Sequence, residues 1–194
     1  MVFFTHFCKK TSFLWVLVLL LSTATLAFAA TSSIQIKSAE LQAQDEAYNL
    51  SADVTIEFDS EIEEAINKGV PLDFLTEFQI VSPRKYWFDD EIVTASRNTT
   101  LSYHALTKQY LVNRGIHQKS FETLGEATQE LAELSDWKVA EISLLDKSEV
   151  YNAALLIRLD QTKLPKAIQA DPIASEKWNL SSQKYVWSLK DLNK

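Results

Sequence analysis

Hydrophobic and polar residues alternate along most of this chain, and the alternation predicts β-strands. The clearest case runs from Tyr48 to Phe58, where every second side chain is apolar. A period of two places one set of side chains on a buried face and the other set in water. Similar patterns predict further strands over 72–80, 151–159 and 185–189. Apolar residues on both faces of the 151–159 strand indicate a central position in a sheet.

The segment before this strand predicts a hairpin with an irregular first arm. Residues 34–36 and 41–43 alternate in opposite phases, so we expect a β-bulge near residues 38–39. The acidic pair at 45–46 predicts the turn of the hairpin.

Two segments carry helix signals. The Ser-Glu-Ile-Glu string at 60–63 has the spacing of a capping box, and Gly69 predicts the end of a short helix over about 61–68. The string at 123–126 is a second capping box, and it predicts a longer helix over about 124–135.

The remaining pattern predicts a long strand region from Ile92 to Val112, a turn at 113–115, and a strand over 137–145. Six or seven strands therefore occur with only two helices, and strands do not alternate regularly with helices. This order disfavours a doubly wound parallel sheet. The predicted fold class is mainly β, an antiparallel β-sandwich of the immunoglobulin- or C2-like type.

The first 29 residues predict a cleavable signal peptide. Lys9 and Lys10 precede an apolar core of 15 residues from Ser12 to Leu26, and small residues follow at 27–30. A membrane-spanning helix needs roughly 20 apolar residues, so an uncleaved anchor is the weaker alternative. We predict one exported β-rich domain over residues 30–194, outside the cytoplasm. An uncleaved signal would anchor it to the inner membrane, and the signal is the only membrane contact that we expect.

The amino-acid composition excludes or disfavours several kinds of functional site. Cys8 is the one cysteine and lies in the signal segment, so the mature chain can form no disulfide and no thiolate site. Removing Lys9 and Lys10 from the 19 basic residues leaves 17 against 26 acidic ones, a formal charge of −9 for the exported part. This charge disfavours nucleic acid as a partner. The 3 glycines do not cluster, so no phosphate-binding loop and no cofactor are predicted.

Four strings of residues resemble one family in content and order. They are ADVTIEF at 52–58, GVPL at 69–72, YHALTKQY at 103–110 and YNAALLIRLD at 151–160. The mature chain, from about Ile34 to Trp187, is similar to the exported proteobacterial proteins known as domain of unknown function 4390. The resemblance implies a Gram-negative envelope location. Its members are often encoded near a sensor kinase, which suggests an accessory role in envelope signalling. The family supplies no catalytic residues to carry over.

His104 is the best catalytic candidate, since a histidine pKa lies near neutrality. It could act with a carboxylate from Asp89, Asp90 or Glu91 in a hydrolase or a metal site. The alternation predicts instead that His104 points to solvent and that the three acids form a turn. His117 lies in a polar stretch. We therefore predict no catalytic residue and no metal ligand.

The stretch around Trp87 is the best candidate for a partner surface. Three adjacent aromatic residues cannot all face one core from a strand, so at least one, Trp87 first, should be exposed. Aromatic residues beside an arginine are typical of interface centres. The predicted surface consists of Arg84, Tyr86, Trp87 and Phe88.

These observations favour a non-enzymatic periplasmic domain that binds an envelope protein or peptide. Two alternatives stay open: a hydrolase or metal-dependent enzyme that uses His104, and a carrier of lipid or a small ligand. The carrier would need an internal apolar cavity.

Overall fold

The computed structural model describes residues 32–86, 88–146, 149–170 and 177–189. The chain divides into two units, Met1–Ala30 and Thr31–Lys194, and all described residues belong to the second. The predicted signal peptide and its cleavage site, like Trp87, lie outside the described residues. No helix in the part of the chain that the structure describes has the length and apolar character needed to cross a membrane.

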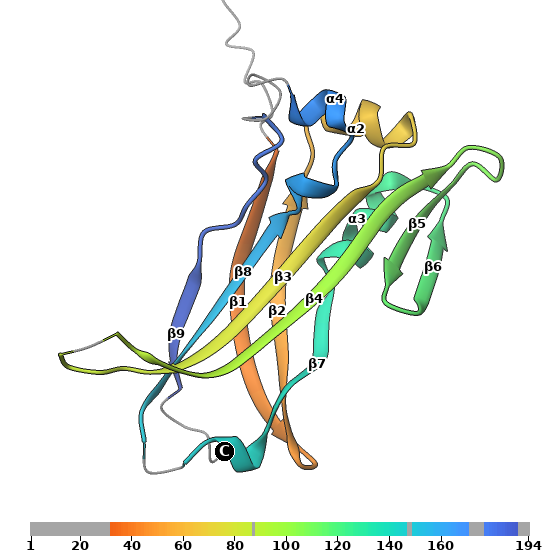
Figure 1. The fold of residues 1–194 in the computed structure, drawn as a ribbon. Helices are drawn as coiled ribbons and strands as arrows, with labels where there is room; N and C mark the ends of the chain where they lie inside the picture. The colour runs from red at the N-terminus through yellow and green to blue at the C-terminus, as the bar shows by residue number, and fades with distance from the viewer. Residues whose placement is uncertain (1–31, 87, 147–148, 171–176, 190–194) are drawn as a thin grey trace, which may run out of the picture. The chain divides into compact units, whose positions relative to one another are not determined.

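The described chain forms nine strands, three α-helices and two short 3-10 helices (Figure 1). The strands are β1 Ser33–Gln44, β2 Ala47–Glu57, β3 Leu72–Ser82, β4 Asp90–His104, β5 Gln109–Arg114, β6 His117–Phe121, β7 Leu134–Glu141, β8 Tyr151–Leu159 and β9 Tyr185–Leu189. The helices are α2 Ser60–Asn67, α3 Leu124–Ala132, α4 Lys166–Gln169, η1 Ile142–Leu144 and η2 Gln161–Lys163.

The strands form two open antiparallel sheets. Three strands pair in the order β1-β2-β7, and six pair in the order β6-β5-β4-β3-β8-β9. Strand β8 lies between β3 and β9, as its apolar residues on both faces predict. The prediction of a mainly β, antiparallel fold is thus confirmed. The immunoglobulin- or C2-like type of sandwich stays a prediction.

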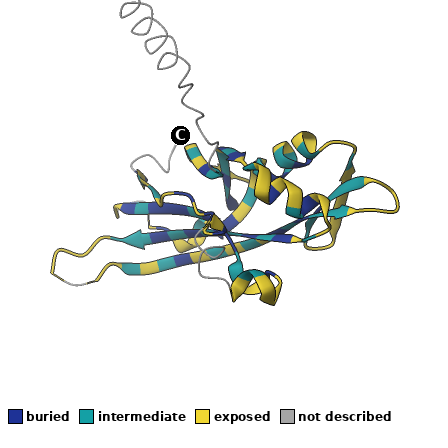
Figure 2. Cartoon of the chain, turned by 90° about the horizontal axis from the view of Figure 1, so that it is seen from above, coloured by how far each residue is buried: buried dark blue, intermediate teal, exposed yellow. Residues whose placement is uncertain are grey.

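The core lies between the facing sides of the two sheets. Tyr48 and Leu50 of β2 and Phe78 and Leu155 of the larger sheet are each at most 1% exposed and belong to one cluster. A second cluster joins Phe74 to the apolar faces of α2 and α3. Burial of the apolar side chains of both sheets therefore stabilises the packing of one layer on the other. Figure 2 shows buried residues along the strands and exposed ones on the hairpin loops.

The alternation predicted the hairpin of β1 and β2 correctly. The register of β1 shifts between Ile36 and Ser38, within a residue of the expected bulge. Asp45 and Glu46 form the turn, and Asp45 has a φ of 57°.

One predicted strand is wrong. The region from Ile92 to Val112 is not a single strand but a hairpin, in which β4 ends at His104 and β5 begins at Gln109. The turn at 105–108 contains no glycine, proline or asparagine, so the usual turn signals are missing there. Lys108 adopts the left-handed conformation, with a φ of 55°.

The first helix has the expected range but a different cap. Asp59, not Ser60, is the N-cap, and its Oδ1 accepts hydrogen bonds from the N–H groups of Glu61 and Ile62 at 3.0 and 2.9 Å. Gly69 ends the helix with a φ of 89°, as predicted. In the second helix the capping box of residues 123–126 is confirmed. That helix ends at Ala132, three residues earlier than predicted, because β7 begins at Leu134.

Candidate functional site

The predicted partner surface lies on the loop between β3 and β4. Tyr86 is 87% exposed and Phe88 is 85% exposed, whereas Trp87 lies outside the described residues. Lys85 places its Nζ 5.6 Å from the centre of the Tyr86 ring. We call Arg84, Tyr86, Trp87 and Phe88 the aromatic loop.

Contacts across the base of the aromatic loop fix its ends. The Arg84 N–H donates a hydrogen bond to Asp89 Oδ1 at 3.2 Å, and the Arg84 guanidinium forms an ion pair with Asp90. Glu91 accepts a hydrogen bond from the Thr94 hydroxyl. Arg84 therefore binds groups at the base of its own loop. The prediction that the three acids form a turn is wrong for two of them: Asp89 lies in the loop, whereas Asp90 and Glu91 begin β4 and pair with Ser82 and Val81 of β3.

His104 lies far from these acids. Because β4 is extended, the 14 residue steps from Asp90 to His104 separate the two residues by about 45 Å. His104 is exposed, and its Nδ1 lies 3.0 Å from the Thr107 hydroxyl. The pairing of His104 with Asp89, Asp90 or Glu91 is therefore wrong. His117 is exposed on β6.

No group of three metal-ligating side chains occurs among residues 32–86, 88–146, 149–170 and 177–189. Two open grooves follow the edges of the smaller sheet. One of about 370 Å³ lies between β2 and the segment 128–135, and one of about 510 Å³ lies between residues 32–36 and 179–185. Both are lined by mixed polar and apolar residues, so neither resembles an apolar ligand cavity.

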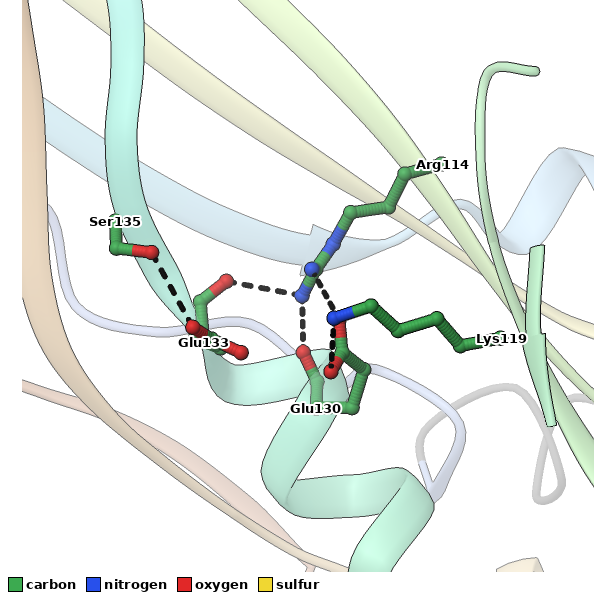
Figure 3. Close-up of polar contacts among 5 residues, drawn as sticks. All are labelled: Arg114, Lys119, Glu130, Glu133 and Ser135. Carbon is green, nitrogen blue, oxygen red and sulfur yellow. Dashed lines mark hydrogen bonds and ion pairs between the residues drawn. The ribbon is translucent and has the colours of Figure 1, made fainter. Parts of the chain in front are cut away.

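A polar cluster joins β5 and β6 to the C-terminal end of α3 (Figure 3). The Arg114 guanidinium donates to Glu130 Oε1 at 2.6 Å, to the Glu130 carbonyl, and to the Glu133 carbonyl at 2.9 Å. Lys119 Nζ reaches Glu130 Oε2 at 2.9 Å. The last turn of α3 has no basic residue of its own, so Arg114 supplies the cation that its free carbonyls favour.

Arg97 lies on the inner face of the larger sheet, opposite Thr76 of β3. Its Cζ is 5.0 Å from the centre of the Trp137 ring on β7, so the contact spans the two sheets. Its Nε is buried and has no hydrogen-bond partner among the residues that the structure describes. The adjoining cavity of about 10 Å³ holds at most about one water molecule. Burial, and then the charge of Arg114, lower the pKa of Arg97 to about 10.

Sequence reasoning missed both arginines, although a signal was present. Arg97 and Thr99 stand in register with Val93 and Leu101, at positions where the alternation requires apolar side chains. A charged residue on the inward face of a strand breaks the local pattern, and such breaks concentrate at functional sites.

These features define a mainly β domain of two antiparallel sheets, with an exposed aromatic loop at one hairpin and a half-buried arginine between the layers. The family model of the domain of unknown function DUF4390 matches residues 31–188, and the chain belongs to this family. The family resemblance expected from the four strings is thereby confirmed. A comparison with curated proteins found no match, and neither did a comparison with solved structures.

Proposed function

We propose that this chain is a non-enzymatic domain of the Gram-negative envelope that binds a protein or peptide partner through the aromatic loop. The exposure of Tyr86 and Phe88, 87% and 85%, carries the proposal. Large aromatic side chains are usually buried, and each can remove about 150–250 Å² from water on contact. Tyrosine, tryptophan and arginine are also enriched among the residues that dominate binding energy.

The base of the aromatic loop supports this function. Arg84 contacts both Asp89 and Asp90, so the loop is closed at its base before a partner arrives. A pre-ordered loop loses less conformational entropy on binding than a free one. The signal peptide predicted over residues 1–29 supports the envelope location, and an accessory role in envelope signalling rests on the gene context of the family.

No described contact favours either alternative. A hydrolase that uses His104 lacks the nearby carboxylate on which the hypothesis depended. A carrier would need an enclosed apolar cavity, whereas the ligand-sized spaces among the described residues, of about 370, 510 and 230 Å³, are open grooves. Interface formation is the function that the exposed loop supports best.

Site-specific photo-crosslinking in the native bacterium tests the proposal. A benzophenone amino acid replaces Tyr86 or Phe88 in two variants, and Leu106 in a control. Leu106 is 92% exposed at the turn between β4 and β5, so it samples equally accessible apolar surface away from the aromatic loop. We expect one discrete protein adduct shared by positions 86 and 88 and missing at 106. Identical adduct patterns at all three positions, or none at any, would refute the proposal.

A further inference from the structure

Arg97 occupies a position that ordinary folding does not explain. Its side chain stands in the apolar register of β4 and is half-buried, yet within the described residues its guanidinium joins no ion pair and donates no hydrogen bond. A guanidinium carries five N–H donors in a rigid plane. A buried donor without an acceptor is costly, so each one calls for an explanation.

The carboxylates at the C-terminal end of α3 have other partners. Glu130 binds Arg114 and Lys119 through its two oxygens. Glu133 lines the small cavity beside Arg97, but its Oε1 accepts a hydrogen bond from the Ser135 hydroxyl at 3.3 Å. Arg114 adds a second positive charge close by. The place between the sheets at Arg97 is therefore electropositive within an otherwise acidic domain.

We propose that Arg97 and Trp137 form a binding site for a carboxylate. The Arg97 guanidinium lies over the ring of Trp137, and this contact restricts where the guanidinium can move. A planar guanidinium matches the two oxygens of a carboxylate through paired hydrogen bonds. Partial removal from water strengthens this pairing relative to an exposed lysine. The ligand chemistry is an acidic side chain or a C-terminal carboxylate.

The site deepens the proposed function, because the carboxylate would come from the protein or peptide partner. It does not depend on the aromatic loop, which precedes β4, because the seven residue steps from Asp90 to Arg97 span about 23 Å of extended strand. The two claims can therefore fail separately: small blocked peptides report on Arg97 alone, whereas crosslinking reports on the aromatic loop.

NMR titration of the exported domain with short peptides tests the site. The probes are Ac-Ala-Glu-Ala-NH₂, the uncharged Ac-Ala-Gln-Ala-NH₂, and Ac-Ala-Gln-Ala with a free C-terminal carboxylate. The signals followed are the Arg97 Nε–H and the Trp137 indole N–H. We expect saturable shifts with the first or third probe and none with the second. Whichever of the two binds identifies the source of the carboxylate.

Two variants of equal charge provide the control. Arg97→Gln removes the guanidinium from the site, and Arg158→Gln removes one from the opposite face of the same sheet, where Arg158 pairs with Glu77 at 2.9 Å. We expect at least tenfold weaker binding in the first variant and unchanged binding in the second. Equal shifts with the uncharged peptide, or equal losses in both variants, would overturn the assignment. The wild-type comparison of charged and uncharged peptides decides the question even if Arg97→Gln folds poorly.

Discussion

Replacing Arg97 with methionine should make the domain more stable. Burial, and then the charge of Arg114, lower the pKa of Arg97 to about 10, which corresponds to a destabilisation of the charged form by about 3 kcal/mol. The side chain keeps part of its water contact, and solvent screening reduces this figure to about half. Loss of the cation–π contact with Trp137 destabilises the domain by about 0.5–1 kcal/mol, which offsets part of this gain. Methionine keeps an unbranched stem in the same space, so we expect a gain of about 1 kcal/mol.

Replacing Arg114 with methionine should instead lower the stability of the domain. Arg114 donates to the Glu130 carboxylate and to two carbonyls at the end of α3. Hydrogen bonds of charged groups contribute about 1.5–3 kcal/mol each, and the Glu130 side chain, only 9% exposed, would keep Lys119 as its one cation. We expect Arg114→Met to destabilise the domain by about 2–4 kcal/mol.

Urea unfolding of the two variants beside the wild-type domain, at pH 7 and fixed salt, measures both changes. The pair is informative because the substitution, the charge change and the sheet face are matched, whereas only the Arg114 guanidinium donates hydrogen bonds to described carboxylate and carbonyl groups. A loss of more than about 1 kcal/mol in Arg97→Met would show that Arg97 stabilises the fold. The proposed carboxylate site would then no longer be supported by the cost of an unpaired guanidinium.

Three further outcomes follow from single contacts. Asp59→Ala should cost about 1 kcal/mol in urea unfolding and Ser60→Ala close to nothing, because Asp59 caps α2; equal costs would restore Ser60 as the cap. Phe78→Ala should cost about 3–5 kcal/mol, since Phe78 is fully buried; a loss under 1 kcal/mol would contradict the packing. Hydrogen bonds from Thr162 lower the pKa of Asp160. Its stabilising effect should therefore be present above about pH 4 and fade as pH falls through the lowered pKa, a decline that Asp160→Asn should lack in acid titrations of stability.

The parts of the fold that sequence predicted well are those in which burial repeats. The strands β2 and β8 each present apolar side chains at every second position over nine residues, and β3 does so except at Thr76. Few other conformations can bury such a pattern. The capping box at 123–126 and the helix end at Gly69 were also predictable from sequence, because each depends only on backbone groups within a few residues.

The parts that sequence missed depend on contacts between distant residues. All five residues of β6 are polar or only partly buried, so nothing in its sequence predicts a strand, and pairing with β5 alone defines it. The turn at 105–108 lacks turn residues, and the facing pair Tyr103 and Tyr110, 4.9 Å apart between ring centres, closes that hairpin instead. The contact of Arg97 with Trp137 joins residues from different sheets, which no local pattern could reveal.

The stability of the fold and the proposed binding of a carboxylate both depend on the guanidinium of Arg97. A guanidinium without an acceptor weakens the fold, whereas the same guanidinium lowers the free energy of a complex when a carboxylate reaches it. A position that costs stability yet stays charged is expected where function requires it. Arg97→Met should therefore unfold at higher urea than the wild-type domain and fail to bind the glutamate peptide or the free carboxylate peptide. A variant that is more stable and still binds would place the carboxylate elsewhere, and a variant that is less stable would make Arg97 part of the core.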